Sequence, residues 1–309
     1  MAILEKNIAR NLPRLGWINY WNLLPFYQEL KRKIPKLDLV KGHPVEINRM
    51  LINGDLDFAP SSSICLADKY KLTMATPLGV SATGKVDSVY LGFSKQQALL
   101  YQYYCARNTE LANILKSSMS DIDFNCLELA NLIFKSAKIP SKLKAPERHS
   151  FILSSASAAS VGLTKLFYQL WLGATLPLID AQNDARNPIE LLIGDLALQK
   201  RSNYEYCIDL SEAWFELTKL PFVFSVWQGK TTMPDDFKKQ LTLAAEAAQY
   251  NMHNHPESYF PVNFPQNEQG LEIDLASYWQ KIEYKLTASH QKGLELYLFL
   301  IKRLENSAI

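Results

Sequence analysis

The stretch "LPFVFSVWQG" at residues 220–229 is the starting point for interpreting the fold. It is almost wholly apolar, with β-branched and aromatic residues in its middle and Pro221 near its start, which is typical of a buried strand. A second β-rich run, "DSVYLGFS" at residues 87–94, precedes it in the chain. If both runs cross between two lobes, the chain leaves lobe one, builds lobe two and returns.

The N-terminal part of the chain alternates strands and helices. Strands with helices between them are predicted at residues 14–20, 37–43 and 56–60. Asn53-Gly54 is a good signal for the end of the helix before the third strand. A further helix is predicted to begin in "SSSICLADKY" (61–70), where serines are available to cap it. Such alternation predicts a parallel α/β sheet.

The middle of the chain is predicted to be largely helical. Residues 96–135 have a helical pattern, and a polar, basic loop follows at residues 136–150. "FILSS" (151–155) predicts a short strand before a helix that covers residues 155–174. "IELLIGDLALQ" (189–199) predicts a strand that runs into a turn or helix.

Together these elements predict an α/β protein with a two-lobed periplasmic-binding-protein-like fold of type II. Its mixed sheets would be flanked by helices and joined by two crossing hinge strands, with a ligand in the cleft beside them. Lobe one would comprise residues 1–92 and 225–309. Lobe two would comprise residues 93–224, with a helical insertion at about 95–150.

Composition narrows the functional classes. The 309 residues are 48% hydrophobic, so a sizeable core is expected. Lys and Arg number 33 against 31 Asp and Glu, so the net charge of +2 gives no electrostatic case for nucleic acid. No apolar run approaches the roughly 18 residues that span a bilayer, so no membrane is expected. Charges interrupt the first residues, no secretory signal is visible, and we expect a cytoplasmic protein.

The sequence contains no motif that indicates a metal or nucleotide site. The cysteines form no CxxC pair and the histidines are scattered, so no metal is expected. No P-loop, glycine-rich dinucleotide turn or Ser-His-Asp order is present. Candidate acid–base groups remain in Asp55, Asp57, Asp87 and Asp195, for which turn and capping roles are the alternative.

Two serine-rich segments lie at predicted helix starts, "APSSSICLA" (59–67) and "SSASAASVG" (154–162). A helix N-terminus offers unpaired backbone N–H groups and a partial positive charge, and small residues let a carboxylate come close. Because the two segments fall in different predicted lobes, a ligand with two anionic ends could bridge them. Ordinary N-capping is the alternative.

Six segments stand in an order and spacing that point to one family. They are "GWINYWNLLPF" (16–26), "INGDLDFAPSSS" (52–63), "DSVYLGFS" (87–94), "SSASAASV" (154–161), "LLIGDLAL" (191–198) and "LPFVFSVW" (220–227). The most specific are the Asn-containing turn before Leu-Pro, "IGDLAL" and "LPFVFSVW". Together they resemble the chorismate dehydratase family, which catalyses the first step of the futalosine route to menaquinone.

The resemblance implies a hydro-lyase that converts chorismate to 3-[(1-carboxyvinyl)oxy]benzoate and water. By motif position it implies Asn22 and Ser88 as catalytic residues. Aromatisation drives the reaction, so no redox cofactor is expected. The base would be the enolpyruvyl carboxylate of the substrate itself or, as a rival, Asp87. Residues expected to bind this dicarboxylate are Ser61, Ser62, Ser63, Ser155, Ala156, Ser157, Ser160, Asp195, Phe224 and Trp227.

The chain also departs from the family pattern. Gly84-Lys85 stands where Gly-Pro is common, and Ala158 where an Arg or other large residue often stands, so Lys85 is a candidate replacement charge. Two alternatives are kept. One is a non-catalytic carboxylate-binding protein of the same fold. The other is an enzyme resembling 1,4-dihydroxy-6-naphthoate synthase, which uses a histidine in lobe two, where this chain has only His149.

Overall fold

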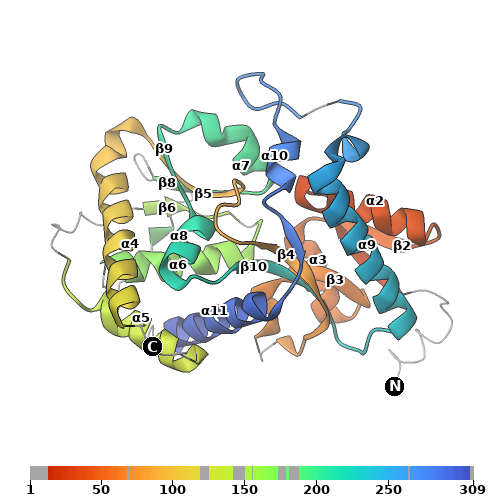
Figure 1. Ribbon diagram of the computed structural model, residues 1–309, viewed down its shortest axis with the longest axis horizontal. Coiled ribbons are helices and arrows are strands. Elements are labelled where there is room, and N and C mark those ends of the chain that lie inside the picture. Colours follow the sequence, from red (N-terminus) through yellow and green to blue (C-terminus); the bar gives the residue numbers. More distant parts are fainter. Residues whose placement is uncertain are drawn as a thin grey trace. The chain divides into compact units, whose positions relative to one another are not determined.

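The computed structural model describes residues 13–67, 70–118, 125–141, 150–154, 156–172, 179–180, 188–263 and 265–306 (Figure 1). The chain divides into two compact units. Unit 1 comprises Met1–Ser81, Val223–Phe264 and Asp274–Thr287. Unit 2 comprises Ala82–Phe222, Pro265–Ile273 and Ala288–Ile309.

Unit 1 is built on a mixed sheet of six strands in the order β11-β4-β10-β3-β1-β2. The strands are β1 (Arg14–Ile18), β2 (Asp38–Gly42), β3 (Phe58–Ser62), β4 (Thr73–Ala82), β10 (Phe222–Gly229) and β11 (Glu283–Lys285). β1 pairs in parallel with β2 and β3, whereas β10 runs antiparallel to β3. The run at 220–229 therefore supplies a central strand of this sheet.

Helices cover this sheet. They are α2 (Leu24–Lys33), α3 (Pro44–Asn53), α9 (Asp235–Asn254) and α10 (Leu275–Trp279), with 3₁₀ turns η1 (Trp21–Leu23), η2 (Ser63–Leu66) and η6 (Pro256–Tyr259). α3 ends at Gly54, whose φ of 84° is left-handed, as its Asn-Gly sequence predicts. α2 packs along α9 (Figure 1). Its Phe26 contacts Trp227 of β10 and Tyr284 of β11, with ring centroids 5.7 and 5.5 Å away.

Unit 2 has a second mixed sheet, in the order β7-β6-β8-β5-β9. Its strands are β5 (Val89–Phe93), β6 (Ser150–Ile152), β7 (Ile179–Asp180), β8 (Ile189–Ile193) and β9 (Tyr206–Asp209). β5 is antiparallel to both β8 and β9, and β6 is parallel to β7 and β8. Buried Val, Ile, Leu and Phe side chains on β5 and β8 form the centre of this unit.

The helices of unit 2 include the predicted insertion. They are α4 (Ala98–Ser118), α5 (Cys126–Ala137), α6 (Ala158–Leu172), α7 (Asp195–Lys200), α8 (Leu210–Thr218) and α11 (Ala288–Asn306), with short turns η4 (Lys95–Gln97) and η5 (Arg201–Asn203). Buried Asn108 of α4 ties two other helices together. It donates to Ala213 O of α8 and accepts from Trp171 Nε1 of α6, at 3.3 and 3.2 Å. The insertion is thus an integral part of unit 2.

The first crossing strand differs from the prediction. β5, within residues 87–94, lies inside the sheet of unit 2 between β8 and β9. The chain first passes between the units at the end of β4, whose last residue is Ala82, and returns at the start of β10, whose first residue is Phe222. It passes between them three more times, after residues 264, 273 and 287, so that α11 belongs to unit 2. β4 escapes prediction because Pro77 and Gly79 are poor strand formers.

One helix prediction is also wrong. Residues 61–62 still belong to β3, and only the 3₁₀ turn η2 follows, because paired backbone continues through the serines. The helical pattern predicted over 96–135 is confirmed by two helices, α4 and α5. Asn125 starts the second, accepting from Glu128 N at 2.9 Å within a capping box that the sequence already contains.

Candidate functional site

The carboxyl ends of β1 and β3 meet at one edge of the unit 1 sheet, because the two strands are parallel. Asn22 follows β1 in η1, and Ser63 follows β3 in η2. The start of β10 lies at the same edge, since Ser225 pairs with Ser62. In open α/β sheets this edge is where ligands bind.

The turn that carries Asn22 is anchored by two aromatic side chains. Trp279 Nε1 donates to Trp21 O at 2.8 Å, and Tyr284 OH donates to Asn22 O at 2.7 Å. The side-chain Oδ1 of Asn22 is itself buried and has no hydrogen-bond partner among the described residues. A buried polar atom without a partner is uncommon and is often explained by a ligand or by a catalytic role.

The three serines at the end of β3 and the start of η2 have different environments. Ser61 Oγ donates to Asn48 Oδ1 at 2.8 Å, and Ser62 N reaches the same oxygen at 3.3 Å, so both are used within the fold. Ser63 Oγ is buried with no partner in the described part of the chain. Of these serines, Ser63 is therefore the best placed to bind a ligand.

Gln228 belongs to the same neighbourhood, although it was not predicted. Its Nε2 donates to Ser61 O and Ser62 O at 3.1 and 3.0 Å, and its buried Oε1 has no partner within the described ranges. Successive residues of a strand point to opposite faces of the sheet. Gln228 therefore lies on the same face as Phe224 and on the opposite face from Trp227. The sequence feature that could have pointed to Gln228 is a side-chain amide in a largely apolar strand.

The two aromatic residues predicted on β10 differ in burial. Trp227 is 1% exposed and packs against Phe26 in the core. Phe224 is half-buried. Phe224 is therefore the more accessible of the two to a ligand.

In unit 2, Ser88 stands just before β5 and is 3% exposed. Its carbonyl oxygen accepts from Gly194 N at 2.7 Å, and Val89 pairs with Ile193 of β8. Gly194 has a φ of 61°, which glycine tolerates, and Asp195 follows it as the first residue of α7. The structure therefore brings Ser88 and the backbone next to Asp195 together.

Asp87, the rival base, is tied to its neighbours. Tyr90 OH donates to its Oδ1 at 2.6 Å, and Lys85 Nζ lies 3.1 Å from the same oxygen. Both contacts stabilise the negative charge of the carboxylate and engage its Oδ1. The Lys85 charge is thus paired with Asp87.

The serine-rich segment before α6 forms a local cap. Ala156 N donates to Ser154 Oγ at 3.1 Å, and Ser157 Oγ accepts from Ser160 N at 3.2 Å and from Ser160 Oγ at 3.0 Å. Ala158 is the exposed first residue of α6. Ser155 lies outside the described residues, as does His149. Unit 2 also contains a buried histidine, His290 of α11.

The remaining predicted aspartates of unit 1 stand before β3. Asp57 Oδ2 accepts from Arg14 N at 2.7 Å, which is a turn role, and Asp55 is exposed. Among the described residues, no group of three or more His, Cys, Asp or Glu could hold a metal ion. None of the helices in those ranges is both long and apolar enough to cross a membrane.

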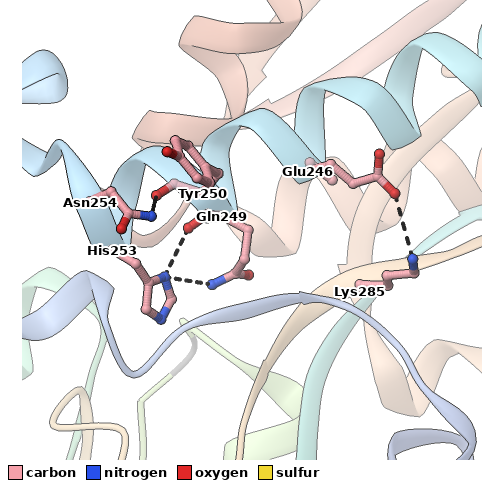
Figure 2. A pocket seen from close by; sticks show the side chains of 7 residues that line it. Glu246, Gln249, Tyr250, His253, Asn254 and Lys285 are labelled. Carbon is pink, nitrogen blue, oxygen red and sulfur yellow. Dashed lines mark hydrogen bonds and ion pairs between the residues drawn. The ribbon is translucent and has the colours of Figure 1, made fainter.

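A groove of about 340 Å³ lies on unit 1 along α9 (Figure 2). It is lined by Ala245, Glu246, Gln249, Tyr250, His253, Asn254 and Lys285. Figure 2 shows these polar groups bonded locally: His253 Nδ1 lies 2.8 Å from Gln249 O, and Lys285 pairs with Glu246 at 3.5 Å. None of the predicted site residues lines this groove, so it does not support the predicted chemistry.

Comparison with known proteins supports a common fold and a family. A family model described as menaquinone biosynthesis matches residues 13–108 and 130–303. The protein AF1704 from Archaeoglobus fulgidus is similar in structure at 12% identity and a TM-score of 0.58, over 96% of this chain and 98% of that one. The periplasmic aliphatic sulphonate binding protein SsuA from Escherichia coli matches at 11% identity and a TM-score of 0.52, over 96% and 89%. The predicted periplasmic-binding-protein-like fold is confirmed.

Proposed function

The chain belongs to the menaquinone biosynthesis family, and from that premise we propose that it is a chorismate dehydratase. The proposed reaction removes water from chorismate and yields 3-[(1-carboxyvinyl)oxy]benzoate. The sequence segments that carry the resemblance, above all the Asn-containing turn and "LPFVFSVW", support this assignment within the family.

The reaction needs a proton acceptor and a place for the leaving hydroxyl. The C3 hydrogen of chorismate is acidified through the ring double bond that joins it to the ring carboxylate. Its removal leaves an electron pair that forms the C3–C4 double bond as the 4-hydroxyl departs. The hydroxyl takes up a proton and leaves as water, and the ring becomes aromatic. A redox cofactor is therefore not required by the chemistry.

The unpaired Oδ1 of Asn22 is the observation that carries the proposal. The turn around it is fixed by Trp279 and Tyr284, yet its buried amide oxygen has no protein partner among the described residues. An amide offers both an acceptor and donors, so it can hold a hydroxyl or a carboxylate. We assign Oδ1 of Asn22 the role of accepting from a substrate hydroxyl, and its NH₂ group the role of donating to the enolpyruvyl carboxylate, which takes the proton.

Ser88 is the second proposed catalytic residue. A hydroxyl at this position can donate to a carboxylate or to the leaving oxygen. The contacts of Asp87 with Lys85 and Tyr90 favour the substrate carboxylate over Asp87 as the base. Phe224 and Ser63 are proposed to contact the substrate in unit 1, together with Asn22.

The test is incubation of the purified protein with chorismate, followed by ultraviolet absorbance of the aromatic product and by mass. Asn22→Asp places a negative charge beside the substrate carboxylate, and Ser88→Ala removes the hydroxyl. We expect each to lower kcat/KM by about 100-fold or more, as is usual when a group acting in the transition state is lost.

Matched controls are Asn254→Asp and Ser117→Ala, which change exposed residues whose side chains donate to carbonyl oxygens one turn earlier in their own helices. Loss of activity in the controls as well would contradict the assigned roles. Binding of chorismate without turnover by the wild-type protein would instead favour a carboxylate-binding protein.

A further inference from the structure

We propose that Asp209, at the end of β9, is a positioning residue that holds the backbone next to Ser88. This inference rests on the proposed role of Ser88. Asp209 is not in any motif used to identify the family resemblance, and its place just before α8 looks from the sequence like ordinary helix capping.

One carboxylate joins two segments that are far apart in the chain. Oδ1 of Asp209 accepts from Ser211 N and Glu212 N, at 3.0 and 3.1 Å, and so caps α8. Oδ2 accepts from Val86 N and Asp87 N, at 3.0 and 2.8 Å. The side chain is therefore bonded to the two residues that directly precede Ser88.

The backbone conformation of Asp87, the residue before Ser88, is intrinsically unfavourable. Asp87 has a φ of 60°, which is uncommon for a residue other than glycine and costs about 1 kcal/mol or more. Such a conformation persists when its surroundings determine it. Asp209 binds the N–H of Asp87 from one side, and Gly194 N binds the carbonyl of Ser88 from the other, at 2.7 Å.

The burial of Asp209 explains why its carboxylate needs hydrogen bonds from both segments. Asp209 is 4% exposed, and a carboxylate in such a place is stable only when its oxygens are hydrogen-bonded. Four backbone N–H groups satisfy them, two from each segment. Removing either pair of donors would leave part of the group unpaired, so the loop before Ser88 and the start of α8 are held together.

A simpler explanation is that Asp209 only caps α8. One substitution distinguishes this role from that of holding the loop before Ser88. Asn is as good an N-cap as Asp, so Asp209→Asn keeps an oxygen for Ser211 N and Glu212 N. Its other atom is an NH₂ group, which cannot accept from Val86 N and Asp87 N. The variant therefore retains the cap and releases the loop. Asn125→Ala, which removes the cap of α5 in the same unit, is the matched control for loss of a cap.

The experiment is a double-mutant cycle with chorismate as substrate. Asp209→Asn is expected to lower kcat about 10- to 100-fold with a much smaller change in KM, because small misplacement of a catalytic group costs rates of this size. In the Ser88→Ala background the same substitution should lower kcat less than threefold, because its effect passes through Ser88. Asn125→Ala should leave kcat within threefold of wild type. Equal effects of Asp209→Asn in both backgrounds would overturn the proposal.

Amide hydrogen exchange gives a readout that does not depend on turnover. Asp209→Asn should accelerate exchange at Val86 and Asp87 about tenfold or more, while Asn125→Ala should not. Unchanged exchange would show that Asp209 does not hold the loop. If wild-type protein fails to dehydrate chorismate while exchange responds as expected, the proposed function fails and the structural role of Asp209 stands.

Discussion

At the scale of single residues, Ser61 at the end of β3 and Ser63 just after it show how hydrogen bonding distinguishes a structural position from a candidate functional one. Ser61 Oγ bonds to Asn48 at 2.8 Å, whereas Ser63 Oγ is buried with no partner among the described residues. Ser61→Ala should therefore lower the free energy of unfolding by about 1 kcal/mol, while Ser63→Ala should change it by about 0.5 kcal/mol or less. Urea unfolding of both variants measures the difference. Equal destabilisation would mean that Ser63 has a structural partner.

The ionisation of Asp209 predicts a pH dependence. Burial raises its pKa from 3.8 to about 7, although backbone N–H groups of Glu212 and Val86 lower it, and the nearby charge of Glu212 adds to the rise. Between pH 3.8 and about pH 7, Asp209 is protonated in the folded protein but ionised in the unfolded chain. The contribution of Asp209 to stability is thus fully present below pH 3.8 and is lost as the pH rises to about 7.

This dependence can be isolated by subtraction. Wild type and Asp209→Asn are unfolded in urea between pH 5 and pH 8, and their free energies of unfolding are compared at each pH. Over this range the wild type should lose stability relative to the variant as the pH rises, by at most about 3 kcal/mol. A difference that stays flat over this range would contradict the raised pKa.

At the scale of elements, the turn η1 depends on the aromatic groups that hold it. Tyr284→Phe removes the hydroxyl that donates to Asn22 O. Tyr103→Phe is the matched control, because its buried hydroxyl donates to Trp171 O at 3.1 Å in unit 2. Both variants should lose about 1 kcal/mol of stability in urea unfolding. Only Tyr284→Phe should also lower kcat, by about tenfold, because Asn22 is less well oriented; an equal kcat in both variants would contradict this.

The pairing of β4 with β10 requires close backbone approach. A Cβ at Gly79 would lie 2.1 Å from Ser225 O, so Gly79→Ala should destabilise the protein by about 3 kcal/mol. Gly54→Ala is the control, because its Cβ would meet no atom within 4 Å and only the φ of 84° is strained. It should cost about 1 kcal/mol in the same urea titration. Similar losses in both variants would count against the close approach.

Elements with a clear local pattern were predictable, and those defined by pairing were not. β1, α3 and β8 follow from apolar spacing and from the Asn-Gly helix stop. β4 was missed because only its partners make Pro77 and Gly79 acceptable in a strand. The serines at 61–63 resemble a helix start, but long-range pairing with β10 extends β3 through Ser62.

At the scale of the whole molecule, some residues of the candidate site could be predicted from the family resemblance. Others were recognised only from their contacts in the structure. Asn22 and Ser88 could be proposed from motif position alone. The unpaired oxygen of Asn22 and the four bonds of Asp209 could not, because they arise from residues far apart in the chain. Gln228 and Asp209 became visible only once their hydrogen-bond partners were known.

The most direct measurement follows chorismate that carries deuterium at C3. Incubated with the wild-type protein, it should yield an aromatic product that has lost one water and has lost the deuterium, as judged by mass and ultraviolet absorbance. Recovery of unchanged chorismate under conditions where the protein binds it would contradict the proposed dehydration.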